Sequence, residues 1–104
     1  MSEKEIFNYL GLAQKARVIT SGVNTLIYKG NFHKYGIIII AGNAPETVKR
    51  KFKKKAESNN VCFYSFSDKV QLGQSIGKSP ITVLAIDQGK LAEKIKELIG
   101  GDRS

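Results

Sequence analysis

The segment Ser21-Gly22-Val23-Asn24 contains residue types that suit contacts with a phosphate and with a base edge. A helix that begins at Ser21 and Gly22 presents unpaired backbone N–H groups with a partial positive charge, and Gly22 has no Cβ to obstruct a phosphate. The Asn24 amide offers both a donor and an acceptor, which can pair with a base edge. The same four residues also fit an ordinary helix start with a solvated asparagine, so their surroundings must decide.

Cationic residues flank this helix start on both sides in the sequence. Lys15 and Arg17 precede it, and Lys29 and Lys34 follow it. The whole chain of 104 residues has 17 Lys and Arg against 9 Asp and Glu, a formal net charge of +8. Such an excess makes nucleic acid the first partner to consider and an anionic membrane surface the second.

The most concentrated positive charge is the run KRKFKKK at residues 49–55, in which six of seven residues are cationic. Val48, Phe52 and Ala56 recur every four residues, so they are expected to form the buried stripe of a helix. Phe52 is therefore expected in the core rather than in base stacking. Like charges four residues apart cost about 0.2–0.5 kcal/mol per pair, which packing can absorb, so an inert solvated face is the alternative. The auxiliary polyanion contacts expected here are Lys49, Arg50 and Lys53.

Membrane proteins and enzymes receive little support. The longest aliphatic run, Ile37–Ala41, is far shorter than the ~20 residues that span a bilayer, and the acidic N-terminus does not fit a signal peptide. No membrane partner and a cytoplasmic location are therefore expected. The single cysteine, Cys62, excludes an internal disulfide and a cysteine-pair metal site. His33 is the only histidine, so no catalytic residue, metal or cofactor is predicted.

Helices and short apolar strands alternate along the chain, which is typical of an α/β layered sandwich and here of one domain over residues 1–104. Ile37–Ala41 is β-branched and apolar on both faces, which predicts a buried central strand. The other expected strands cover residues 18–20, 61–66 and 81–86. The expected helices cover about residues 3–16, 21–29, 43–59, 68–76 and 87–100. Their expected caps are Thr20 or Ser21, Asn43, Asp68 and Asp87. Residues 100–104 are expected to form a loose tail.

Two motifs together carry a family resemblance. Residues 10–22 read LGLAQKARVITSG and residues 72–78 read LGQSIGK, with the expected buried strand and basic helix between them. At this spacing the chain resembles the superfamily of ribosomal proteins L7Ae and L30e, and within it the small bacterial YlxQ-type members. The resemblance implies a three-layer α-β-α sandwich with a mixed four-stranded sheet. It also implies a non-enzymatic domain that binds structured RNA, ribosomal or other noncoding, in many relatives at a kink-turn.

In relatives that bind a kink-turn, the helix start reads G-x-N-E-x-x-K, and its Asn, Glu and Lys approach tandem sheared G·A pairs. Gly22 and Asn24 match this pattern, whereas Thr25 replaces the Glu and Tyr28 replaces the Lys. Thr25 offers a hydroxyl instead of a charged acceptor, and Tyr28 offers stacking or one hydroxyl bond instead of a cation. Lys29 is adjacent but lies about 100° further round the helix. These departures favour RNA binding over standard kink-turn recognition.

The second element of the resemblance is the loop that follows Leu72-Gly73. In kink-turn binders this loop holds an extruded nucleotide against apolar side chains. Ile76 or Ile81 would supply such a contact here, and Lys78 a contact with a phosphate, although Ile81 fits the core better. The complete set of predicted RNA-binding residues is Lys15, Arg17, Ser21, Gly22, Asn24, Thr25, Tyr28, Lys29, Ile76, Gly77 and Lys78.

Three classes of function are compatible with these features. The first is a module that binds structured RNA. The second is a protein-interaction module in which Thr25 and Tyr28 mark lost RNA specificity. The third is a nonspecific basic protein with weak, salt-sensitive adhesion to polyanions. A specific RNA site should prefer a kink-turn over a plain duplex of equal length, whereas the third class excludes such a preference.

Overall fold

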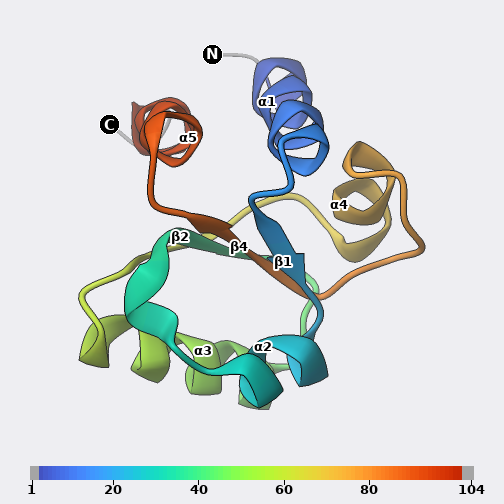
Figure 1. The fold of residues 1–104 in the computed structure, drawn as a ribbon. Coiled ribbons are helices and arrows are strands. Elements are labelled where there is room, and N and C mark those ends of the chain that lie inside the picture. The colour runs from blue at the N-terminus through green and yellow to red at the C-terminus, as the bar shows by residue number, and fades with distance from the viewer. Residues whose placement is uncertain (1–2, 102–104) are drawn as a thin grey trace.

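A mixed four-stranded sheet lies between two layers of helices in the computed structural model, which describes residues 3–101 (Figure 1). The strand order is β1-β4-β2-β3, in which β2 and β3 are parallel and the other neighbouring pairs are antiparallel. The strands are β1 (Ile19–Ser21), β2 (Tyr35–Ile40), β3 (Cys62–Ser65) and β4 (Val83–Asp87). This architecture confirms the expected three-layer α-β-α sandwich.

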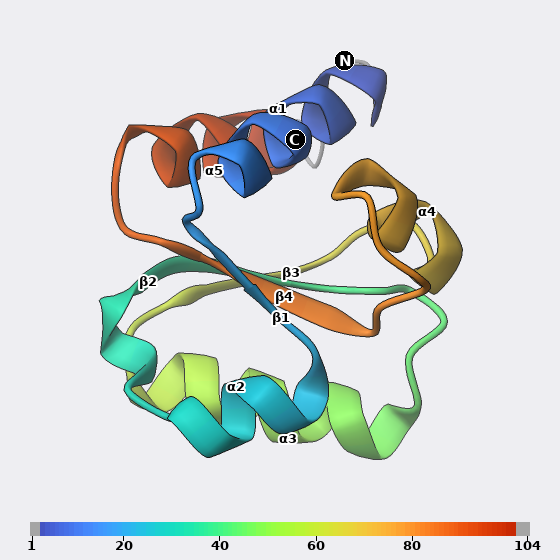
Figure 2. The same ribbon diagram turned by 45° about the vertical axis from the view of Figure 1, so that its right-hand side comes forward.

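The helices divide between the two faces of the sheet (Figures 1 and 2). One face is covered by α1 (Glu3–Lys15), α4 (Lys69–Ser75) and α5 (Lys90–Gly101). The other is covered by α2 (Val23–Lys29), the short 3-10 helix η1 (Phe32–Lys34) and α3 (Glu46–Ser58). Each layer encloses its own apolar cluster against the sheet.

The central strand β2 is buried along its whole length, as its apolar run predicts. Because successive side chains of a strand point to opposite faces, Ile37 and Ile39 pack under α1, α4 and α5. Ile38 and Ile40 pack on the other face against α2 and α3, where Phe52 is fully buried. Phe52 is therefore a core residue, as expected.

One expected helix cap forms as predicted. The Asp68 carboxylate accepts a hydrogen bond of 2.9 Å from the Gln71 backbone N–H at the start of α4. At the start of α2, by contrast, Gly22 occupies the cap position and no side chain caps the helix. The prediction that Thr20 or Ser21 caps α2 is wrong, because both belong to β1, where Ser21 pairs with Leu84.

The other two expected caps have different roles. The Asn43 side chain accepts a 3.0 Å hydrogen bond from the Lys69 backbone N–H, so it joins the segment before α3 to the start of α4. Asp87 remains in β4, where its backbone N–H donates to the Val18 carbonyl at 2.9 Å, and α5 begins only at Lys90. At Asp87, backbone hydrogen bonding beside the sheet is therefore formed in place of an N-cap for α5.

Two element boundaries also differ from the sequence prediction. β4 begins at Val83 because the Ile81 N–H donates to the Lys69 carbonyl, at 3.1 Å, instead of pairing in the sheet. At the C-terminus, α5 continues to Gly101. Residues 102–104 of the expected tail lie outside the described residues.

Three connections meet at one end of the sheet: β1 to α2, β2 to α3, and α4 to β4 (Figure 1). The Gly22 N–H donates to the Val83 carbonyl at 2.9 Å, and the Ala41 N–H donates to the Thr82 carbonyl at 2.8 Å. These backbone bonds hold the three connections in a fixed arrangement.

The α4–β4 connection packs directly on α4 at Gly73. The Lys78 N–H donates to the Gly73 carbonyl at 2.8 Å. A Cβ on Gly73 would lie 2.9 Å from the Lys78 carbonyl oxygen and 2.7 Å from the Ser79 carbonyl carbon, closer than Cβ atoms approach backbone atoms. Glycine is therefore required for this approach of helix and connection.

We expect Gly73→Ala to lower the free energy of unfolding by about 1–3 kcal/mol, because the clashing atoms belong to the backbone and the connection must move. Urea unfolding measures the change. Gly11→Ala is the matched control: it lies within α1, and its Cβ would make an ordinary 3.4 Å contact with the Ser75 carbonyl. Alanine's helix propensity should leave that variant unchanged or up to about 1 kcal/mol more stable. Wild-type stability of Gly73→Ala would contradict the expectation.

Candidate nucleic-acid interface

The start of α2 and the α4–β4 connection lie on the same side of the molecule. Gly22 is hydrogen-bonded to Val83, and residues 76–82 lead directly into Val83. In Figure 2 the end of β1 and the connection before β4 occupy neighbouring positions at this end of the sheet, as they do in Figure 1. The fold thus brings together the two segments in which the sequence predicts RNA contacts.

Gly22 combines an unusual backbone conformation with open space. Its φ of 98° lies in the region that favours glycine, and a Cβ there would meet only the Thr25 hydroxyl oxygen, at 3.7 Å. The helix that follows has only seven residues. A helix this short aligns few peptide dipoles, so the partial positive charge at its N-terminus is small.

The outer face of α2 presents polar and aromatic side chains to solvent. Leu26 anchors the helix in the core, whereas Asn24, Thr25, Tyr28 and Lys29 are exposed. The Tyr28 side chain is 91% exposed, which is unusual for a large aromatic residue. Asn24 and Tyr28 are four residues apart and therefore lie on the same face of the helix. A hydrogen-bonding amide and a free ring are thus neighbours.

The α4–β4 connection presents Gly77 and Lys78 to solvent. Gly77 has φ of 70°, and a Cβ on it would meet nothing within 4 Å. Ile76, in contrast, is 5% exposed and belongs to the core under α1 and α5. The side chain expected to hold an extruded nucleotide is therefore not available at the surface. Ile81 is half-buried against the same core, as expected.

We use the name loop–helix surface for the half-buried Gly22 and the exposed residues that these two segments bring to one side of the molecule. Its members are Gly22, Asn24, Thr25, Tyr28, Lys29, Gly77 and Lys78. Neither residues 22–29 nor residues 76–82 contain an Asp or Glu, so the charge that these segments contribute is purely positive. Ser21 lies beside this surface but is half-buried in β1.

Lys15 and Arg17 are exposed, but they lie at the opposite end of β1 from Gly22. The Val18 carbonyl accepts a hydrogen bond from the Asp87 N–H, which places this end of β1 beside the last residue of β4. At about 3.3 Å per extended residue, Arg17 is separated from Gly22 by roughly 16 Å of chain. The structure does not bring these two cations to the loop–helix surface, although they are close to it in sequence.

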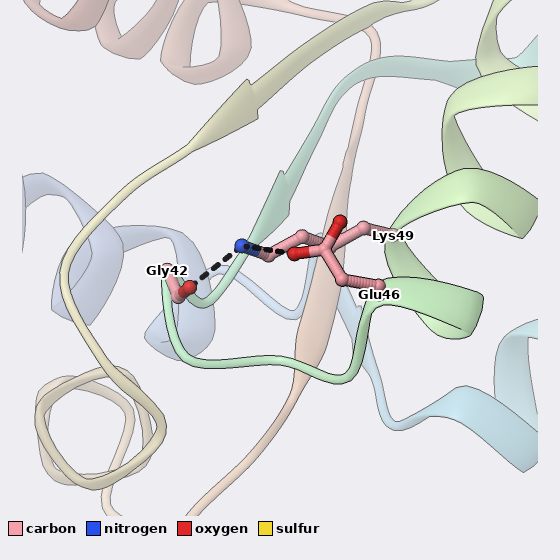
Figure 3. A network of polar contacts seen from close by, with 3 residues as sticks. All are labelled: Gly42, Glu46 and Lys49. Atoms are coloured by element: carbon pink, nitrogen blue, oxygen red, sulfur yellow. Dashed lines mark hydrogen bonds and ion pairs between the residues drawn. The ribbon is translucent and has the colours of Figure 1, made fainter.

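The predicted auxiliary residues of α3 divide into two kinds. The Lys49 ammonium donates to the Gly42 carbonyl at 2.7 Å and lies 3.6 Å from the Glu46 carboxylate (Figure 3). These contacts join the segment before α3 to the first turn of the helix. Arg50 and Lys53 are exposed. Sequence reasoning missed the role of Lys49, although its spacing of three residues from Glu46 is typical of a helical ion pair.

Residues 3–101 contain no group of three or more His, Cys, Asp or Glu side chains that could hold a metal ion. His33 is exposed in η1, and Cys62 is half-buried at the start of β3. No helix in this part of the chain has both the length and the apolar composition to cross a membrane.

Two solved structures have the same fold as this chain. A protein of unknown function from Bacillus halodurans C superposes with a TM-score of 0.87 at 23% sequence identity, over 94% of this chain and 99% of that one. The Giardia lamblia 15.5kD RNA binding protein superposes with a TM-score of 0.77 at 20% identity, over 97% of this chain and 92% of that one. At these identities the likeness is one of fold alone.

Two curated relatives align over almost the whole chain. The RNA-binding protein YlxQ of Enterococcus faecium is 35% identical over 101 residues, 96% of each chain. The RNA-binding protein YlxQ of Bacillus subtilis (strain 168) is 28% identical over 99 residues, 95% of this chain and 99% of the relative. The family model matches residues 4–96, which confirms the resemblance carried by the two sequence motifs. The chain belongs to the ribosomal protein L7Ae/L30e/S12e/Gadd45 family.

Proposed function

We propose that this chain recognises structured RNA through the loop–helix surface. The observation that carries the proposal is the backbone hydrogen bond between Gly22 and Val83, which fixes the start of α2 beside the α4–β4 connection. The absence of Asp and Glu from residues 22–29 and 76–82 supports a polyanion as the partner. Family membership and the RNA-binding relatives support RNA in particular. As a member of this family, the chain is a non-enzymatic protein.

Each exposed residue of the surface has a distinct role in this proposal. Lys78 contacts a phosphate, and Gly77, with open space around it, lets the RNA backbone approach closely. The Asn24 amide pairs with a base edge through its donor and acceptor. The Tyr28 ring stacks on an unpaired base, which is a common mode of recognition for single-stranded loops and bulges in RNA.

The RNA element that suits these residues is a kink-turn or a related bend in ribosomal or other noncoding RNA. Such an element offers both irregular base pairs and unstacked nucleotides. Thr25 and Tyr28 replace a carboxylate and an ammonium with a hydroxyl and a ring. We therefore expect weaker charge-assisted contacts with guanine and a larger share of stacking than in relatives with the G-x-N-E-x-x-K pattern. The cytoplasmic location expected from the sequence stays a prediction.

Lys78→Ala should weaken RNA binding and reduce the slope of log affinity against log salt concentration by about 1, because one phosphate contact is lost. A salt titration of binding to a kink-turn RNA measures the slope. Lys90→Ala is the matched control, since this exposed lysine follows the opposite end of β4. Equal changes in the two variants, or no change in either, would remove Lys78 from the interface.

Asn24→Ala should reduce the preference for a kink-turn over a plain duplex of equal length, because one well-placed bidentate contact with a base contributes about 1–3 kcal/mol of discrimination. The measurement is the ratio of the two dissociation constants at one salt concentration. Asn8→Ala, an exposed asparagine on α1, should leave that ratio unchanged. If the wild-type protein binds both RNAs equally, the chain is a nonspecific polyanion binder and the proposal fails.

Crosslinking in cells followed by sequencing of the attached RNA identifies the natural partner. We expect enrichment of fragments of ribosomal or other noncoding RNA that contain a bend with unpaired nucleotides. A Lys78→Ala and Asn24→Ala double variant, handled in parallel, should lose this enrichment. Absence of any enrichment from the wild-type protein would favour a protein-interaction module that retains the fold.

A further inference from the structure

Two of the six cations in the α3 run are held by other parts of the chain. Lys49 is bonded to the Gly42 carbonyl and paired with Glu46 (Figure 3). The Lys55 ammonium lies over the Phe32 ring, 5.4 Å from its centroid. Both lysines are only half-exposed. These two charges therefore contribute to the local structure around the helix.

The other four cations point away from the protein. Arg50, Lys51, Lys53 and Lys54 are exposed, and none of their side chains forms a hydrogen bond or ion pair with another residue of the range 3–101. At 100° per residue, Arg50 and Lys54 lie about 160° round the helix axis from the buried Phe52. Together with Thr47 and Glu57, the four cations line a shallow groove of about 510 Å³. We call these four residues the α3 cationic face.

The helix α5 provides a contrast within the same protein. Its Lys94 lies 3.5 Å from Glu97, and its Lys96 lies 2.7 Å from Glu93. The hydrogen bond from Lys96 to the Glu93 carboxylate raises the pKa of Lys96. Two of the three lysines on α5 thus have a counterion three residues away, Lys90 being the exception. The α3 cationic face is bordered by Glu57, with which none of its four side chains forms an ion pair. Among the described residues, α3 therefore has more cationic side chains without a counterion than α5 has.

We propose that the α3 cationic face binds the phosphate backbone of an RNA double helix, without reading its sequence and separately from the loop–helix surface. Residues 50–54 rise about 6 Å along the axis of α3, so their four cations form a compact group that can contact neighbouring phosphates. Binding there also relieves the repulsion between like charges at Arg50 and Lys54. Because α2 and α3 cover the same face of the sheet (Figure 2), one folded RNA can reach both surfaces.

The chemistry of this face favours a duplex over other polyanions. Single-stranded RNA binds best where aromatic rings can stack on its bases. Phe52, within the run, and Phe32, whose ring lies beneath the Lys55 ammonium, are both buried. Binding to the interface of an anionic membrane requires exposed apolar side chains, and α3 has no large exposed apolar residue. The α3 cationic face therefore exposes charged side chains without aromatic or large apolar ones, and such a surface suits the regular array of phosphates in a duplex.

A pair of charge-matched variants tests the proposal. Arg50→Gln with Lys54→Gln removes two charges from the α3 cationic face, whereas Lys49→Gln with Lys55→Gln removes two charges that are held by the chain. Binding of each full-length variant to a plain RNA duplex is measured across a salt series. We expect the first pair to reduce the log–log slope by about 2, and the second pair by less than half as much. Circular dichroism checks that both variants are folded.

Equal slope changes in the two variants would overturn the proposal, because they would mean that only net charge matters. An unchanged slope in the first pair would overturn it as well. The proposal would also be overturned if the Arg50→Gln, Lys54→Gln variant bound an RNA duplex with wild-type affinity but no longer bound vesicles of phosphatidylserine and phosphatidylcholine. Repeating the comparison in a Lys78→Ala background separates the two surfaces: the loss caused by the first pair should persist there, and its disappearance would assign duplex binding to the loop–helix surface.

Discussion

The burial of β2 on both faces is the constraint on which the rest of the structure depends. All four residues of Ile37–Ile40 are fully buried, and each fully buried isoleucine contributes about 1.5–3 kcal/mol relative to an exposed one. Half of these side chains point to each face, so both faces of the sheet need a layer of helices. The chain must then cross between layers at the ends of the strands. The loop–helix surface lies at two of those crossings and includes the first helix residues that follow β1.

A rigid scaffold holds these crossings in place. Gly22 is tied to Val83 and Ala41 to Thr82 by backbone hydrogen bonds, and Gly73 lets the α4–β4 connection pack directly on its helix. The exposed side chains of the surface therefore project from a backbone whose position is set by the core. Such an arrangement lowers the entropy that must be lost when a partner binds.

Sequence patterns predicted the features that depend on local chemistry. The β-branched run gave the central strand, the four-residue spacing placed Phe52 in the core, and Asp68 caps α4 as its position indicated. Features that depend on pairing between distant segments could not be predicted in the same way. Asp87 is kept in β4 by the hydrogen bond from its N–H to the Val18 carbonyl, just before β1. Because β1 runs antiparallel to β4, Arg17 lies at the end of β1 opposite to the loop–helix surface.

The connection between β2 and β3 has a further consequence. Parallel neighbours cannot be joined by a tight turn, so α3 is the crossover that their pairing requires. Its inward stripe, including Phe52 and Ala56, is buried by that packing, whereas Arg50 and Lys54 on the opposite side are exposed. The exposed side of a helix that the fold requires can thus change its charge while the fold is kept.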